Sequence, residues 1–374
     1  MEVSQKVRVA VIGGGPAGCA AALSLARQGI DDVALVEAGR YARPRVGESL
    51  PPDARGLLQS LGVWDAFSTQ GHAPCLGNCS AWGSNTLGYS DFVLQPMGPG
   101  WHLDRRRFDA WLAEEVRAAG TCVRIGTRLV AAVRHADGFV LELRDADRVT
   151  HLHARHVIDA SGCHARFARM LGARRRWIDR LFFVYGYFLP PSQVAAERLT
   201  LVESVEEGWW YRAGLPEGRL CIALACEAKT LRARRLDRWR PWLDLLADSR
   251  HAAQGLAGGT FLKDRMRAMP APTGCLNPMV GDGWLAAGDA ACTFDPLLAR
   301  GIHKAMEDGR EAGQVVARWL RRGRIDAADG YRDLLDSRFR TMLALRDHLY
   351  AQETRWPQAP FWRARAALDS RSTD

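Results

Sequence analysis

Three glycines near the N-terminus have the spacing that lets a protein backbone approach a phosphate closely. Gly13, Gly15 and Gly18 follow an apolar stretch that predicts a strand and open a small-residue stretch that predicts a helix. In this order the first glycine permits a tight turn, and the second lets backbone N–H groups approach a pyrophosphate. The third, together with Ala17, allows close packing of helix on strand. The helix N-terminus adds partial positive charge, so this turn predicts a pyrophosphate site.

An acidic residue follows at the distance that dinucleotide binding requires. Glu37 ends a second predicted strand, Val33–Glu37, 24 positions after Gly13. A carboxylate at this place accepts hydrogen bonds from the ribose hydroxyls of a bound dinucleotide. Because strand, glycine turn, helix, second strand and acid occur together, the region predicts a dinucleotide-binding unit rather than an ordinary tight turn.

The bulk composition narrows the classes of partner. The chain has 374 residues and a net charge of +9, and 47 of its 51 basic residues are arginines. Arginine excess can mark nucleic acid or an acidic protein partner, but here it is spread along the chain. We therefore expect no nucleic-acid binding and keep a docking face for an acidic protein or peptide as an alternative.

The cysteines and the apolar segments of the sequence indicate the cellular compartment. Nine cysteines are scattered without paired metal-ligand spacings, and Cys75 and Cys79 are interpreted as a chance pair. No signal peptide or long apolar segment is visible. The expectation is a reduced cytoplasmic protein with no metal site and no membrane contact.

The order of the predicted elements indicates one domain inserted into another. The chain returns to small-residue, cofactor-domain character after a long region of strand-like pattern, and then continues with a helix from about residue 301. We predict a discontinuous cofactor-binding domain at 1–75, 101–170 and 275–330, a substrate domain at 76–100 and 171–274, and a C-terminal helical segment at 331–374.

Four separated segments match one family pattern. They are residues 13–18, Asp104-Arg-Arg-Arg-Phe-Asp109, Val157-Ile-Asp-Ala-Ser-Gly162 and Leu285-Ala-Ala-Gly-Asp289. Over nearly the whole chain they resemble the FAD-dependent superfamily typified by p-hydroxybenzoate hydroxylase. The resemblance implies an α/β fold, in which a Rossmann-like FAD-binding domain of the glutathione reductase/p-hydroxybenzoate hydroxylase type carries an inserted β-rich substrate domain and a helical C-terminus. It also implies FAD as cofactor, with Asp289 at the ribityl hydroxyls and Arg105 beside the FAD.

Two further segments resemble the loops that flank the flavin ring in tryptophan halogenases and their relatives. One is Pro44–Leu50, which contains Arg45, and the other is Phe294–Ile302. The resemblance implies that Arg45 contacts the cofactor and that Gly301 and Ile302 open a helix aimed at the N1/C2 edge of the flavin. The positive end of that helix would stabilise the anion that forms on reduction.

Halogenase features themselves are missing from the sequence. Those enzymes use a lysine soon after the Gly-Glu-Ser loop, whereas this chain has none between Lys6 and Lys229. Their second signature, WxWxIP, is altered at residues 209–216, and residues 298–300 replace the small polar residues of relatives. What remains resembles the halogenase-like FAD monooxygenases that mature tryptophylquinone cofactors by oxygenating a tryptophan inside a protein. The segments at 81–84, 100–105 and 353–362 carry this part of the resemblance.

The resemblance implies an enzyme that hydroxylates an aromatic, indole-containing substrate, either free or peptidyl. The oxygen would come from O₂ through a flavin C4a-hydroperoxide. NAD(P)H or a partner reductase would reduce the FAD, since the chain has no second glycine fingerprint. Glu48 and Asp295 are the candidate catalytic residues for proton transfer, and His102 and His303 are the backup candidates for the same role.

Several readings stay open at this stage. The aromatic residues Trp82, Trp209, Trp210 and Tyr211 either wall the substrate pocket or pack the core of the inserted sheet. The alternative functions are a flavin-dependent halogenase, an FAD reductase of the geranylgeranyl reductase type, and a non-catalytic flavoprotein that chaperones a partner.

Overall fold

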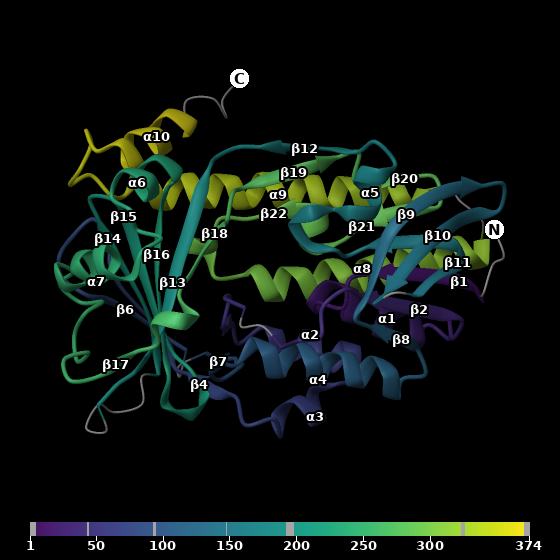
Figure 1. The fold of residues 1–374 in the computed structure, drawn as a ribbon, viewed down its shortest axis with the longest axis horizontal. Coiled ribbons are helices and arrows are strands. Elements are labelled where there is room, and N and C mark those ends of the chain that lie inside the picture. Colours follow the sequence, from purple (N-terminus) through teal and green to yellow (C-terminus); the bar gives the residue numbers. More distant parts are fainter. Residues whose placement is uncertain are drawn as a thin grey trace.

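Two large sheets lie at opposite ends of an elongated molecule (Figure 1). The computed structural model describes residues 5–42, 45–92, 95–146, 148–191, 198–322 and 326–369. Pro44 of the predicted flavin loop lies outside the described residues. Both sheets have buried apolar residues, and the segments that join them provide the functional side chains described below.

The first sheet is built on parallel strands, as the βαβ pattern predicts. Its order is β8, β2, β1, β11, β21, with β20 antiparallel at the edge, β10 antiparallel to β11, and β9 antiparallel to β10. Every residue of β2 is buried, which fits a strand covered on both faces. The strands are β1 (Gln5–Ile12), β2 (Val33–Glu37), β8 (Cys122–Ile125), β9 (Thr127–His135), β10 (Gly138–Asp145), β11 (Arg148–Asp159), β20 (Val280–Gly281) and β21 (Trp284–Ala286).

Two helices from opposite ends of the chain pack closely beside this sheet. They are α1 (Pro16–Arg27) and α8 (Gly301–Arg322). A Cβ atom on Gly309 would lie 2.1 Å from the carbonyl oxygen of Ala17, so only glycine permits the contact. This packing brings the N-termini of both helices to the same region. A third helix, α4 (Arg105–Ala118), begins at the N-cap Asp104, whose carboxylate accepts hydrogen bonds from two backbone amides of the first turn.

The second sheet is mainly antiparallel, and its two faces have different roles. Trp210 and Trp242 of α7 (Trp239–Ala247) are buried together on one side, while Trp209 and Tyr211 belong to a separate cluster on the other. The alternation of side chains along a strand produces this division. The strands are β5 (Gly77–Ala81), β6 (Gly88–Asp91), β13 (Leu181–Leu189), β14 (Leu199–Val205), β15 (Gly208–Gly214), β16 (Leu220–Glu227), β17 (Thr260–Phe261) and β18 (Arg267–Pro270).

Short elements connect the two large sheets. One three-stranded sheet contains β12 (Arg174–Trp177), β19 (Gly274–Asn277) and β22 (Cys292–Thr293), so residues 174–177 do not join the second large sheet. Another contains β3 (Ser49–Leu50), β4 (Ala73–Cys75) and β7 (Gly100–His102). The remaining short helices are α2 (Ala54–Leu61), α3 (Trp64–Ser68), α5 (Arg166–Met170) and α6 (Ala228–Ala233).

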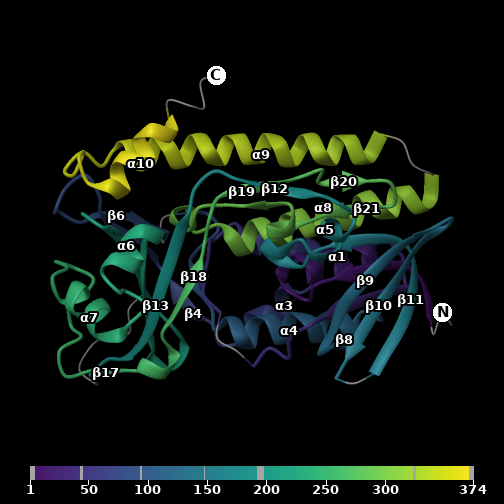
Figure 2. The same ribbon diagram turned by 45° about the horizontal axis from the view of Figure 1, so that its top comes forward.

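The C-terminal part is helical and spans the molecule. Helix α9 (Asp326–Ala351) runs along both halves, and α10 (Pro360–Asp369) folds back beside its end near the second sheet (Figures 1 and 2). The predicted fold class is therefore confirmed, including the helical C-terminus. Within the described ranges, no helix combines the length and apolar character needed to cross a bilayer.

Candidate FAD and substrate site

The glycine turn has the close contacts that its spacing predicts. Gly13 has a φ of 111°, and a Cβ atom there would lie 2.2 Å from the carbonyl oxygen of Ala160. A Cβ on Gly18 would lie 1.8 Å from the Gly13 carbonyl oxygen. These two glycines therefore allow α1, β1 and the end of β11 to meet.

Gly15 differs from the other glycines of the turn because a Cβ atom added at this position would point into open space. The nearest atom to a Cβ there is Arg45 Nη1, at 3.9 Å. Gly15 is also the N-cap of α1, and no side chain caps the first turn. The first amides of α1 thus remain available to a ligand at this opening. An open approach and uncapped amides are what a pyrophosphate requires, so this part of the site fits a dinucleotide.

Glu37 lies at the end of β2 and holds the glycine turn directly. Its Oε2 accepts a hydrogen bond from the Gly14 amide at 2.7 Å, and its Oε1 accepts one from the Gly39 amide at 2.6 Å. The predicted contact with ribose hydroxyls would use the remaining lone pairs of the same carboxylate. That contact stays a prediction.

The two predicted cofactor arginines share one buried carboxylate that the sequence reasoning missed. Arg105 donates Nε and Nη2 to Asp109 at 3.0 and 3.1 Å, and Arg45 donates Nη1 to it at 3.2 Å. Asp109 is buried, and Arg105 also donates to the Val46 carbonyl. The signal was present, because positions 105 and 109 are one helical turn apart. Asp109 therefore holds both guanidinium groups at the edge of the site.

Replacing Asp109 by alanine is expected to destabilise the protein by about 3–5 kcal/mol, because the change removes one partner of a buried charge pair. Glu114→Ala on the same helix is the matched control. Its exposed pair with Arg117 is worth about 1 kcal/mol or less. Urea unfolding followed by circular dichroism measures both changes, and equal midpoints for the two variants would contradict the anchoring role of Asp109.

A cavity of about 280 Å³ lies between the predicted flavin loops and the second sheet. Asp289, half-exposed in the short turn Gly288–Ala290, lines it, as do Gly301 and Ile302 at the start of α8. A Cβ on Gly301 would meet no atom within 4 Å. The structure thus brings the residues predicted for the ribityl chain and the flavin ring to one cavity.

A lysine that the sequence reasoning did not single out also lines this cavity. Lys304 is buried, its Nζ donates to the Cys292 carbonyl, and it lies 3.7 Å from Asp289 Oδ1 and 3.4 Å from Asp308 Oδ2. The lysine expected of a halogenase follows the Gly-Glu-Ser loop in sequence. Lys304 enters from helix α8 instead, and it places a positive charge beside Asp289.

Glu48 is buried at the boundary of the same cavity. Its Oε2 accepts a hydrogen bond from the Gly47 amide at 2.9 Å; its buried Oε1 has no hydrogen bond of ordinary geometry among the described residues, and the thiol of Cys221 interacts with this carboxyl group. Burial raises the pKa of this carboxyl group. An unpartnered buried oxygen costs stability, so it indicates a site where a ligand completes the hydrogen bonding.

Asp295 lies on the opposite loop and joins three parts of the chain. Its Oδ1 accepts a hydrogen bond from the Leu297 amide, and its Oδ2 accepts one from the Tyr350 hydroxyl at 3.0 Å. Tyr350 in turn accepts a hydrogen bond from Trp209 Nε1 at 2.9 Å. Burial raises the pKa of Asp295 to about 6. Unlike Glu48, this carboxyl group is already held on both oxygens.

The other sequence candidates occupy different places. Of the four aromatic residues, Tyr211 lines the cavity, and Phe183 lines it beside Tyr211 although it was not predicted. Trp82, Trp209 and Trp210 are not among the lining residues and pack against core groups. The two histidines that were backup candidates for proton transfer do not line the cavity either. His102 bonds to Thr200, and His303 lies beside Arg300 and Asp53.

A second cavity of about 850 Å³ adjoins the first. Glu48, Arg105 and Met269 line both. The second cavity also has Tyr185 and Tyr187 in its wall. Six arginines and two acidic residues line it: Arg45, Arg105, Arg106, Arg219, Arg265, Arg267, Glu48 and Asp104. The excess of positive charge favours an anionic ligand.

The glycine turn, the two arginines held by Asp109 and the cavity at the predicted flavin loops fit a flavin-type dinucleotide, and comparison with known proteins gives the family. The chain belongs to the FAD binding domain family, whose pattern matches residues 6–340. It is therefore an FAD-dependent oxidoreductase of the halogenase and monooxygenase superfamily, and the predicted resemblance is confirmed.

Three relatives illustrate the range of the family. LodB of Marinomonas mediterranea, named as an FAD-dependent oxidoreductase, is 28% identical over 362 residues, which cover 96% of this chain and 97% of LodB. The peptidyl tryptophan dihydroxylase QhpG is 25% identical with a TM-score of 0.71, covering 96% of this chain and 78% of QhpG. The myxobacterial chondrochloren halogenase CndH has a TM-score of 0.87 at 22% identity, covering 96% of this chain and 86% of CndH, and so shares the fold.

Proposed function

We propose that this protein is an FAD-dependent monooxygenase that hydroxylates an indole-bearing substrate, namely a tryptophan within a peptide or protein. The observation that carries the proposal is the arrangement at Glu48. A buried carboxyl group, of which only Oε2 accepts a backbone hydrogen bond, lies where the cavity at the predicted flavin loops meets a larger cavity. With the flavin ring in the smaller cavity, the target ring would lie where the two cavities meet, and the larger cavity suits the chain on either side of it.

The cavity walls are chemically suited to an aromatic substrate. Phe183, Tyr211 and Phe294 line the smaller cavity with aromatic surface. Aromatic rings are held by such surfaces through offset or edge contacts. Bound FAD would be held by the α1 amides, Arg45, Arg105 and Asp289, and when reduced it would supply the electrons that activate O₂.

Glu48 is assigned the proton-handling role in this proposal. One oxygen atom of O₂ enters the substrate, and the other must leave as water. The protonated carboxyl group of Glu48 delivers a proton from Oε1 to the leaving oxygen. Asp295 then acts as a positioning residue, because its hydrogen bonds hold the flavin loop against Tyr350.

The arginine-rich cavity supports a substrate with acidic groups near the target residue. Arg219 donates Nη2 to Asp104 at 2.7 Å, but its buried Nε has no hydrogen-bond partner among the described residues. A carboxylate of the substrate would satisfy it. The relative QhpG is described as acting on peptidyl tryptophan, and that description supports a peptidyl rather than a free substrate.

The test is product analysis by mass spectrometry with ¹⁸O₂, in the presence of chloride and bromide. The substrates are tryptophan peptides with acidic flanks, the same peptides with amide flanks, and free tryptophan, each tried with NADH, with NADPH and with a separate flavin reductase. Gain of ¹⁸O is the expected result, with the acidic peptides preferred. That preference should decrease in the Arg265→Gln/Arg267→Gln double variant.

Other outcomes would replace the proposal. Incorporation of halogen would identify a halogenase, despite the missing lysine after the Gly-Glu-Ser loop. Saturation of a double bond without O₂ would identify a reductase of the geranylgeranyl type. Stoichiometric binding of a partner with no turnover would favour a flavoprotein chaperone.

A further inference from the structure

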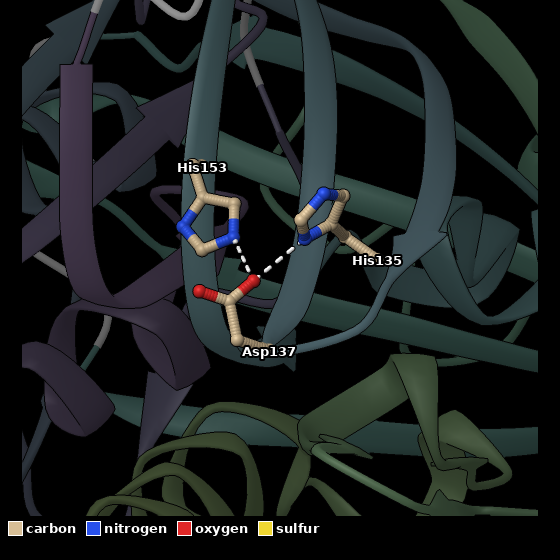
Figure 3. A group of neighbouring side chains, drawn as sticks. All are labelled: His135, Asp137 and His153. Atoms are coloured by element: carbon tan, nitrogen blue, oxygen red, sulfur yellow. Dashed lines mark hydrogen bonds and ion pairs between the residues drawn. The ribbon is translucent and has the colours of Figure 1, made fainter.

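A separate group of metal-ligating side chains lies on the first large sheet, remote from the flavin cavity. His135 ends strand β9, Asp137 lies in the turn that leads to β10, and His153 lies on the neighbouring strand β11 (Figure 3). The other end of β11, at Asp159, reaches the glycine turn. Six positions of extended strand separate His153 from Asp159, which is roughly 20 Å.

The three side chains converge on one point. His135 Nδ1 lies 2.6 Å and His153 Nε2 lies 2.9 Å from the same oxygen, Asp137 Oδ1. The two rings approach this oxygen from different strands, with the carboxylate between them (Figure 3). All three ligand atoms lie within 4.8 Å of one another. Two imidazole nitrogens and a carboxylate oxygen form a donor set that suits divalent transition metals.

The backbone holds this donor set in place. His135 pairs with Gly138 across the two-residue turn, and His153 pairs with Val140 on the next strand. His153 is largely buried, whereas His135 and Asp137 are exposed, so an ion can enter from solvent. A ligand set fixed by sheet register needs little rearrangement to close on an ion.

The surroundings are compatible with a cation. Arg155 on β11 and Arg134 on β9 are the arginines that line the adjoining cavity; the Arg134 guanidinium pairs with Asp282 and lies 4.9 Å from the Phe139 ring centroid. Its charge is therefore partly offset. Asp137 and His153 also line a cavity of about 480 Å³, which leaves room for a water ligand beside the ion.

We propose that His135, Asp137 and His153 bind one divalent transition-metal ion of the Zn²⁺ type, with water as the remaining ligand. The ion would replace the protons that now lie between the two rings and the carboxylate. It would tie the β9–β10 turn to strand β11. This site is independent of the proposed function, because none of its residues lines the flavin cavity.

The experiment is calorimetric titration of the untagged, FAD-loaded protein with ZnCl₂, checked by metal analysis after dialysis. One equivalent is expected to bind, and the unfolding temperature is expected to rise with Zn²⁺ concentration. His153→Gln and Asp137→Asn should each weaken this binding by at least about tenfold. Asn is well tolerated in turns, so Asp137→Asn removes the charge while keeping the hairpin. The matched control is His348→Gln, because His348 is an exposed histidine on α9 that lies outside the cluster.

Two results would overturn the proposal. One is the absence of Zn²⁺ binding to the wild-type protein. The other is equal binding to the wild type, His153→Gln and Asp137→Asn, which would place the ion elsewhere, for example on the exposed thiols of Cys122 and Cys163. FAD content and circular dichroism, measured on every variant, separate loss of the site from loss of the fold.

Discussion

Replacing Glu48 by glutamine is expected to lower turnover by about 10²–10⁴-fold, the usual contribution of a positioned general acid or base. The substitution keeps the size of the side chain and the hydrogen bond from the Gly47 amide, but it removes the proton that Oε1 would deliver. FAD should stay bound, because the change adds no bulk. Turnover by product analysis and FAD content by visible absorbance are measured on the same preparation.

The pH dependence gives a second readout for the same residue. Burial raises the pKa of Glu48 above that of an exposed glutamic acid, so its protonated form persists to higher pH. If the protonated form is the proton donor, wild-type turnover is high below this raised pKa and falls as the pH rises through it. Glu48→Gln should lose this limb of the profile, because glutamine does not titrate.

Asp295→Asn is the matched comparison, since it alters the other buried carboxyl group of the cavity. Asparagine keeps an oxygen that accepts from the Leu297 amide, and its Nδ2 can donate to the Tyr350 hydroxyl oxygen, so substitution of a positioning residue should lower activity much less than Glu48→Gln does. A larger loss in Asp295→Asn than in Glu48→Gln would reverse the two assignments. Unchanged turnover in both variants would remove proton handling from these loops.

The contrast between Glu48 and Asp109 explains how much of the site could be predicted from the sequence. The glycine turn lies in a short segment whose chemistry is local, so its residue types and spacing were informative, and Glu48 was a candidate because its loop resembles a flavin-flanking loop of the halogenases. Asp109 was missed because its role depends on Arg45, which lies 64 positions earlier in the chain and meets it only after folding. Its spacing from Arg105 was the one local sign of a partner.

The places of Lys304 and of the tryptophans also depend on contacts that form only after folding. Lys304 lies close to Asp289 because α8 packs against the turn that carries Asp289, and that packing is not visible in the spacing of either segment. The division of Trp209 and Trp210 could have been anticipated, since neighbouring residues of a strand point to opposite faces. Which face meets the flavin loops depends on how the two large sheets are arranged. The fold class was predictable because strand, glycine turn, helix, second strand and acid lie together near the N-terminus, and because four separated segments resemble one family.

Gly15→Val is expected to weaken FAD binding by about 100-fold or more, equivalent to about 2.7 kcal/mol, while leaving the fold intact. Gly15 is the best position for separating a loss of FAD binding from a loss of the fold. A Cβ there meets only Arg45 Nη1, at 3.9 Å, so the protein without FAD has room for the side chain. The same side chain would fill the space through which the pyrophosphate approaches the uncapped amides of α1. A valine at Gly13 or Gly18 would instead strike backbone atoms and damage the fold itself.

The control for this prediction is Gly56→Val. Gly56 lies in helix α2, and a Cβ atom there also meets nothing within 4 Å, but the position is outside the FAD cradle. Titration of the FAD-depleted proteins with FAD, followed by flavin fluorescence, measures the affinity, and circular dichroism measures the fold. Because both variants add the same side chain to an open glycine, weakened FAD binding in Gly15→Val alone assigns the pyrophosphate to the N-terminus of α1. Equal affinities in the two variants would mean that the FAD phosphates bind elsewhere, and the arginine-lined cavity beside Arg45 would then be the next place to search.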